Sequence, residues 1–152
     1  MPYRESSILT SLVITLVIWG SYTLGIINLF EQQLLTTGNI YDLLFTAVIY
    51  TIFLEVVLQT SVTISKHKEA NDKSDERDKL IAMRANYYAY KILTFVFFCV
   101  SFYILFPVIA PHTFAMHDLA KEYEILHLMV AFGLVAEVVC LLVKLISYRR
   151  GY

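Results

Sequence analysis

The chain has few charged residues and few cysteines. Of its 152 residues, 16% are charged and two are Cys. Soluble globular domains average roughly 25% charged residues, so this composition leaves little room for a polar exterior. Cys99 and Cys140 both lie inside long apolar stretches, at different expected depths along their helices. We therefore expect two buried free thiols and no disulfide.

The motifs of the common enzyme classes are also missing. The sequence has no nucleophile and base at the spacing of a known catalytic motif. It also has no Cys-x-x-Cys, no phosphate-binding loop and no nucleotide-binding fingerprint. We therefore predict that the protein is not an enzyme. We also expect no cofactor and no nucleic-acid partner.

Apolar residues dominate what is present, at 58% of the chain. Four stretches, at about 8–30, 41–65, 87–110 and 123–147, are long enough to cross a hydrocarbon core about 30 Å thick. Lipid cannot satisfy open backbone groups, so these stretches must be helices. The first is too long for a signal peptide and lacks a cleavage site, so we expect it to be a span. The sequence predicts an all-α, four-helix transmembrane bundle in one membrane domain over 1–152.

The basic residues gather on one side of this expected bundle. That side comprises the N-terminus, the loop 66–86 and the C-terminus, whereas the opposite side holds only Lys121. The positive-inside rule then predicts that both termini are cytoplasmic, with the protein in a prokaryotic inner membrane. The Lys and Arg residues on the basic side are Arg4, Lys66, Lys68, Lys73, Arg77, Lys79, Arg84, Arg149 and Arg150.

The second and fourth apolar stretches match when the chain is shifted by 82 positions. Tyr41 then meets Tyr123, and Glu55 meets Glu137, in one ungapped register. Shared Val and Leu are common among membrane helices, so the shared glutamate and tyrosine carry most of the argument. The first and third stretches match only faintly.

This internal match predicts two tandem helical hairpin repeats, at about 8–65 and 87–147. Each repeat has an even number of spans, so the two would be parallel repeats related by an axis along the membrane normal. Glu55 and Glu137 would then lie at equal depth, roughly 15 Å from their cytoplasmic helix ends. A charged side chain near the bilayer centre costs roughly 2.5–3.5 kcal/mol, and such residues are usually functional.

Two buried carboxyl groups close together suit proton-linked chemistry. Burial favours the neutral acid, and a neighbouring carboxyl strengthens this preference in one of the two. Such a pair titrates as a unit and can exchange a proton for a cationic ligand. The alternative is that both groups only bond neighbouring helices, at about 0.6 kcal/mol per hydrogen bond. The predicted ligand- or proton-binding residues are Glu55, Glu137, Thr51, Gln59 and Thr94.

Further polar residues lie near this expected pair. Thr51, Glu55, Gln59 and Thr63 recur every four residues, which places them along one side of a helix. Gly133 in the fourth stretch would allow a neighbouring helix to approach closely. The other candidate lining residues are Ser11, Thr15, Tyr22, Lys91, Ser101 and Lys144.

The loop between the two repeats carries charges of both signs. Ser74 followed by Asp75 and Glu76 is typical of a helix start, with a capping hydroxyl and then acids in the first turn. We expect the third helix to begin near Asp75, outside the membrane. A charge cluster of this kind is usually a solvated cap that fixes topology. The alternative is a docking site for a cytoplasmic protein, formed by Asp75, Glu76, Arg77 and Asp78.

The same segment carries a family resemblance. The run Asp75-Glu76-Arg77-Asp78-Lys79-Leu80-Ile81, with Tyr87, Tyr88 and Tyr90 after it, stands just before a membrane helix. It resembles a family of small, uncharacterised prokaryotic integral membrane proteins with an Asp-Glu-Arg-Asp signature at this place. Some members are encoded beside small helix-turn-helix regulators. The likeness covers about twenty residues of the chain and implies no known activity.

Histidines and acids gather on the outer side. Glu124 and His127 have the (i, i+3) spacing of some metal sites, and His117 lies seven residues before Glu124. These three residues could hold Zn²⁺ or Cu²⁺. Phe45 takes the place of His127 in the other repeat, so the duplication does not support the site. Ordinary solvated residues are the alternative.

Two functional hypotheses follow. The first is a proton-linked transporter or permeation unit for a small cationic or amphipathic compound, with Glu55 and Glu137 exchanging proton for ligand. The second is a non-transporting accessory, sensor or regulatory protein whose charged loop binds a partner. Bundles with lipid-facing sides often pair, so we expect a homodimer in the bilayer.

Overall fold

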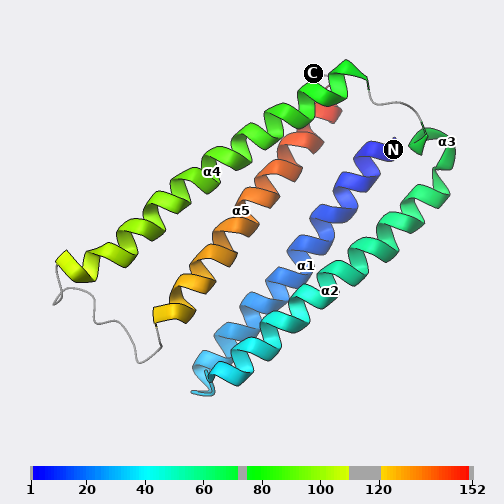
Figure 1. The fold of residues 1–152 in the computed structure, drawn as a ribbon. Helices are drawn as coiled ribbons and strands as arrows, with labels where there is room; N and C mark the ends of the chain where they lie inside the picture. Colours follow the sequence, from blue (N-terminus) through cyan, green and yellow to red (C-terminus); the bar gives the residue numbers. More distant parts are fainter. Residues whose placement is uncertain (1, 72–74, 110–120, 151–152) are drawn as a thin grey trace. The chain divides into compact units, whose positions relative to one another are not determined.

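The computed structural model describes residues 2–71, 75–109 and 121–150. Four of its helices are long: α1 (Tyr3–Glu31), α2 (Thr37–Ser65), α4 (Glu76–Ile109) and α5 (Lys121–Arg150). A short helix, α3 (His67–Ala70), follows α2 (Figure 1).

Within the described residues, four helices are long and apolar enough to cross a membrane. Large apolar side chains along them are widely exposed: Leu24, Val56 and Phe97 are 68%, 62% and 68% exposed. Water-soluble proteins rarely expose apolar surface on this scale. The prediction of an all-helical chain with four long apolar helices is thus confirmed, and these helices indicate a membrane protein.

The helices begin earlier than the apolar stretches do. α1 starts at Tyr3 and α2 at Thr37, although the sequence predicted spans from about residues 8 and 41. The expectation that the third long helix begins near Asp75 is confirmed, because α4 begins at Glu76. Its expected capping residue, Ser74, lies outside the described residues.

The chain divides into two compact units. The first unit comprises Met1–Asp75 together with Leu145–Tyr152, and the second comprises Glu76–Lys144. The first therefore contains α1, α2 and α3, and the second contains α4 and most of α5.

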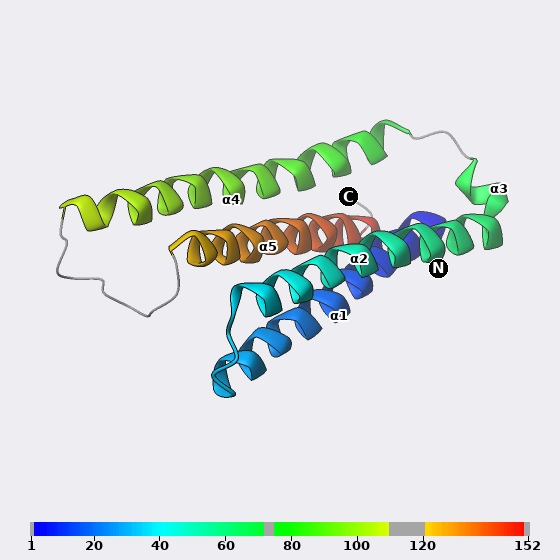
Figure 2. The ribbon, with the colours of Figure 1, turned by 60° about the horizontal axis from the view of Figure 1, so that its bottom comes forward.

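In the first unit, α1 and α2 lie side by side and run in opposite directions (Figures 1 and 2). A tight turn joins them. Gln33 has a φ of 56°, the backbone N–H of Gln33 donates to Phe30 O, and that of Leu34 donates to Leu29 O. This is the Schellman pattern, in which the residue after the C-cap adopts a left-handed conformation.

The next helix starts at once. The Thr36 hydroxyl accepts from the backbone N–H of Asn39 at 3.4 Å and so caps α2. The Asn39 side chain donates to the carbonyl of Leu34 at 2.7 Å, which ties the turn to the new helix. The turn is therefore a hydrogen-bonded connection that holds α1 and α2 as one hairpin.

The half of this hairpin next to the turn is packed with apolar residues. Ile14, Ile18, Tyr22 and Ala47 are buried together. We call these four residues the apolar cluster. Partly buried side chains that pack against them are Trp19, Ile26, Leu43, Leu44 and Leu54.

Close approach of α1 to α2 depends on Gly25. A Cβ on Gly25 would lie 2.8 Å from Leu43 Cδ2, so a side chain there would push α2 away or force Leu43 to move. By contrast, a Cβ on Gly133 would meet no atom within 4 Å. Within the first unit, Gly25 allows the close approach, and the role expected of Gly133 stays a prediction.

The second unit holds α4 and α5, which run in opposite directions (Figure 1). The Cys140 thiol donates to Asn86 Oδ1 at 3.5 Å, which links the two helices. Cys99 is half-buried and Cys140 is buried, and both are free.

Candidate functional site: a polar seam in the α1–α2 hairpin

A row of hydrogen-bonded polar side chains connects α1 and α2. Gln59 and Glu55 of α2 bond Ser7 and Ser11 of α1. Nearer the hairpin's open end, the Tyr3 hydroxyl and Thr63 Oγ1 are 3.1 Å apart. The polar seam is defined by Tyr3, Ser7, Ser11, Glu55, Gln59 and Thr63.

The seam follows from the four-residue spacing of polar residues on both helices. Residues four apart lie on nearly the same side of an α-helix. α1 carries polar residues at 3, 7 and 11, and α2 carries them at 55, 59 and 63. Because the helices are antiparallel, each step along α1 is matched by an equal step back along α2. The two rows therefore meet pair by pair.

Of the hydrogen-bonded residues of the seam on α2, Glu55 lies farthest from the Tyr3 end of the hairpin. The Ser11 hydroxyl donates to Glu55 Oε2 at 3.2 Å, and the glutamate side chain is half-buried. Among the described residues, no hydrogen bond or ion pair reaches its other oxygen, Oε1. One carboxyl oxygen of Glu55 is thus held by a hydroxyl of the neighbouring helix.

Gln59 organises the middle of the seam. Its Nε2 donates to Ser11 Oγ at 2.8 Å and to the Ser7 carbonyl at 2.9 Å. Its Oε1 accepts from the Ser7 hydroxyl at 2.8 Å. Since Ser11 Oγ already accepts from Gln59, its own proton is directed toward Glu55. Gln59 therefore fixes Ser11 as a donor to the glutamate.

The open end of the hairpin, where α1 begins and α2 ends, is tied by α3. We call it the Tyr3 end. The Tyr3 backbone N–H donates to Glu69 Oε2 at 2.7 Å, and Lys66 Nζ donates to Ser6 Oγ at 2.6 Å. Pro2 offers no side-chain cap to α1, so the Glu69 carboxylate binds one of the unsatisfied N–H groups of the first turn.

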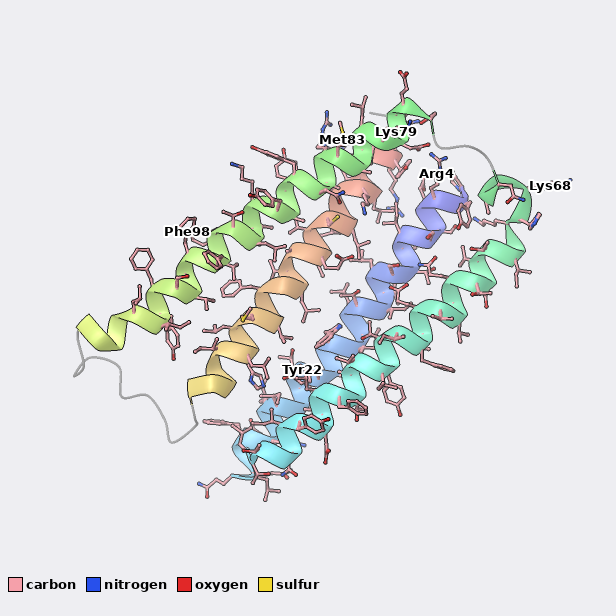
Figure 3. All side chains as sticks on the ribbon, viewed as in Figure 1. Arg4, Tyr22, Lys68, Lys79, Met83 and Phe98 are labelled. Atoms are coloured by element: carbon pink, nitrogen blue, oxygen red, sulfur yellow. The ribbon has the colours of Figure 1, made fainter. Side chains whose placement is uncertain are left out.

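The labelled side chains of Figure 3 show the two ends of this arrangement. Arg4 and Lys68 lie at the Tyr3 end, whereas Tyr22 lies farther along α1, toward the turn. The seam thus begins at the end that carries Arg4 and Lys68, and the apolar cluster follows beyond Glu55.

Two predicted residues of the hairpin, Thr51 and Thr15, lie beyond Glu55 toward the turn. Thr51 lies on the expected side of α2, but its hydroxyl donates to the Ala47 carbonyl of the same helix at 2.8 Å. Thr15 on α1 is buried at 5% exposure. These two threonines continue the four-residue pattern beyond Glu55, and neither has a hydrogen bond to the other helix within the described residues.

Glu137 and Thr94 lie in the second unit. Glu137 is exposed on α5, and the described residues provide it with no hydrogen bond or ion pair. The Thr94 hydroxyl donates to the Tyr90 carbonyl of its own helix at 2.9 Å. Unlike Glu55, Glu137 is not held by a hydroxyl from the helix before it. The two glutamates of the predicted pair therefore have different surroundings.

Other polar residues of the second unit also act locally. Lys91 Nζ lies 5.4 Å from the centre of the Tyr87 ring, a cation–π distance. The Ser101 hydroxyl donates to its own helix, at the Phe97 carbonyl.

The charged segment before the third span lies at the start of α4. Asp75, Glu76 and Arg77 are exposed, whereas Asp78 is buried at 9% exposure. Glu76 and Asp78 stand in the first turn, where acids interact favourably with the positive end of the helix dipole.

The predicted metal site falls largely outside the described structure. His117 is not among the described residues, and neither is the side chain of Glu124. His127 is half-buried on α5. Within the described residues, no group of three or more His, Cys, Asp or Glu side chains is arranged to hold a metal ion.

Sequence reasoning identified the α2 side of the seam and Ser11, but it missed Tyr3 and Ser7. The missed residues lie before or at the edge of the first apolar stretch, where hydropathy gives no signal. The four-residue spacing from Tyr3 through Ser7 and Ser11 to Thr15 would have found them.

Four long apolar helices and a seam of polar groups between two of them indicate an all-α integral membrane protein. No family model matches the chain, and no match was found to a curated protein or to a solved structure.

Proposed function

We propose that the protein is a proton-linked transporter or permeation unit for a small cationic or amphipathic compound. Glu55 is its principal proton-binding residue, and Glu137 is the second carboxyl group. The observation that carries this proposal is the asymmetric environment of Glu55: Ser11 bonds one oxygen, and the described residues give the other no hydrogen bond or ion pair.

The chemistry follows from this arrangement. The charged carboxylate of Glu55 attracts a cation. Protonation neutralises the carboxylate, and the bound cation is then released. Ser11 donates a hydrogen bond to the charged form and so holds the carboxylate in place for exchange. Thr51 and Thr94 have hydroxyls bonded to their own helices, and each retains lone pairs that can accept from a ligand.

The membrane setting is part of the proposal. We propose that the N-terminus, the segment between α2 and α4, and the C-terminus lie in the cytoplasm of a prokaryote, because the Lys and Arg residues gather there. We also propose that the two hairpins are tandem repeats and that the chain forms a homodimer. The shared register of Glu55 and Glu137 supports the repeat.

Proton flux in proteoliposomes tests the proposal. A potassium diffusion potential would drive protons, a pH-sensitive dye inside would report them, and tetraphenylphosphonium would serve as the probe cation. We expect Glu55→Gln to abolish flux and cation-induced proton release, and Glu137→Gln to reduce both. Glu31→Gln, which changes an exposed glutamate at the last position of α1, is the matched control. Equal behaviour of all variants and wild type would refute proton-linked transport.

A second candidate is an accessory or regulatory protein. It is favoured by the exposed charges of Asp75, Glu76 and Arg77 at the start of α4. The polar side chains of the seam bond one another within the α1–α2 hairpin, and this is also consistent with a purely structural role for Glu55. A partner that co-purifies with wild type and is lost on combined charge reversal, Asp75→Lys with Arg77→Glu, would support this candidate. Unchanged proton flux in every glutamate variant would have to accompany that result.

A further inference from the structure

The α1–α2 hairpin differs sharply between its two halves. From the Tyr3 end to Glu55, the facing residues are half-buried and polar, and they bond across the helices. Beyond Glu55 toward the turn, Ile14, Ile18 and Ala47 are 3%, 8% and 5% exposed. Glu55 stands where these two environments meet.

We propose that, in the conformation described here, protons reach Glu55 from the Tyr3 end only, along the polar seam, and that passage to the other side requires a second conformation in which the apolar cluster separates. This inference rests on the proposed role of Glu55 in proton exchange, and it adds the route and its direction. The apolar cluster and the side chains packed against it close the other end.

The polar half is suited to hydrated protons. Hydroxyl and amide groups at Tyr3, Ser7 and Gln59 provide donors and acceptors over eight residues of α1, a rise of about 12 Å. A hydronium ion that arrives through this half gives one proton to Glu55 Oε1. The products are the neutral acid and a water molecule, so mass and charge balance.

The apolar half opposes the same step. A polar group placed without hydrogen bonds in an apolar environment is destabilised, and an isolated ion is destabilised far more. The cluster of Ile14, Ile18, Tyr22 and Ala47 spans more than two turns of α1. A proton that left Glu55 in this direction would have to cross it.

Gln59 acts in this path as a positioning residue. It occupies the acceptor side of Ser11 Oγ and so directs the Ser11 proton toward Glu55 Oε2. This bond holds Oε2 and leaves Oε1 as the oxygen that takes the arriving proton.

Single-cysteine accessibility tests the direction of the path. Cys99 and Cys140 are first replaced by serine, and Lys68→Cys on α3 then reports which side of the vesicle membrane carries the Tyr3 end. A membrane-impermeant, positively charged methanethiosulfonate is added from either side. Ser7→Cys and Thr63→Cys probe the seam at two positions, so one poorly folded variant does not decide the result.

Ile18→Cys and Ala47→Cys probe the apolar cluster on the same two helices. We expect the seam cysteines to react only from the side on which Lys68→Cys reacts. The cluster cysteines should react from neither side, at rates lower by about tenfold or more, because the charged reagent must lose its water to reach them. Reaction at Ser7→Cys should also block proton flux.

The outcomes separate this inference from the proposed function. Flux that does not depend on Glu55 overturns the proposed function, whatever the labelling pattern. Flux that depends on Glu55 with reactive cluster cysteines, or with seam cysteines that react from neither side, overturns the one-sided path alone.

Discussion

Gln59 binds Ser7 at two points: its Nε2 donates to the Ser7 carbonyl at 2.9 Å, and its Oε1 accepts from the Ser7 hydroxyl at 2.8 Å. One side chain of α2 therefore holds both the backbone and the side chain of the same residue of α1. This pair of hydrogen bonds holds α1 against α2 and also fixes how far one helix is shifted along the other.

Replacement of Gln59 by Leu should destabilise the hairpin. Three hydrogen bonds to α1 are lost, and at about 0.6 kcal/mol each in membranes the cost is about 2 kcal/mol. Thermal unfolding in detergent measures the change. The matched control is Thr60→Leu, a change at the neighbouring exposed position, which should leave the melting temperature within error. Equal melting temperatures for the two variants would contradict the structural role of Gln59.

Replacement of Gln33 by Gly should stabilise the α1–α2 turn. Gln33 has a φ of 56°, where an L-residue other than glycine pays roughly 1–2 kcal/mol. The greater freedom of glycine in the unfolded chain offsets part of this gain, so we expect about 0.5–1 kcal/mol net. Gln32→Gly is the control, because Gln32 has ordinary helical angles and gains nothing there. A lower melting temperature for Gln33→Gly would show that the turn has another conformation.

Replacement of Gly25 by Leu should separate α1 from α2. A Cβ alone would lie 2.8 Å from Leu43 Cδ2, so a leucine side chain there requires Leu43 or the helices to move. Overpacking typically costs about 1–3 kcal/mol. Gly20→Leu serves as control, since a Cβ there meets nothing within 4 Å. A disulfide-trapping assay between α1 and α2 would detect the separation, and equal trapping in both variants would argue against close packing at Gly25.

Removal of the Glu69 carboxylate should loosen the start of α1. Glu69 Oε2 accepts from the Tyr3 N–H, and capping interactions of this kind contribute about 0.5–2 kcal/mol. Hydrogen exchange at the Tyr3 amide should be faster in Glu69→Ala than in wild type. Lys68→Ala, on the same short helix, should leave that exchange rate unchanged. Equal rates in both variants would mean that Glu69 does not cap α1.

The long helices could be predicted from hydropathy, and their ends could not. Apolar windows mark only the part of a helix that suits lipid, whereas α1 extends back to Tyr3 and α4 back to Glu76 through polar turns. Local signals helped at one of these ends: a hydroxyl residue followed by the acids Asp75 and Glu76 predicted the start of α4, which begins at Glu76.

The candidate site could be predicted in part. The four-residue pattern on α2 identified the row that contains Glu55 and Gln59, because periodicity reveals a shared helix side. Which residues of α1 would meet that row depended on the turn at Gln33, whose left-handed conformation is unusual for glutamine. The different surroundings of Glu55 and Glu137 were beyond sequence matching, since a shared register says nothing about the partners on the preceding helix.

The short connection Gln32–Thr36 has a consequence for biosynthesis. It is only five residues long and is bonded back onto both helices in the folded hairpin, so α1 and α2 stay close together as they enter a bilayer. Glu55 and Gln59 would be poorly tolerated by lipid on an isolated helix, but α1 brings their bonding partners with it. We therefore expect the insertion machinery to release the two segments together, as a preassembled pair.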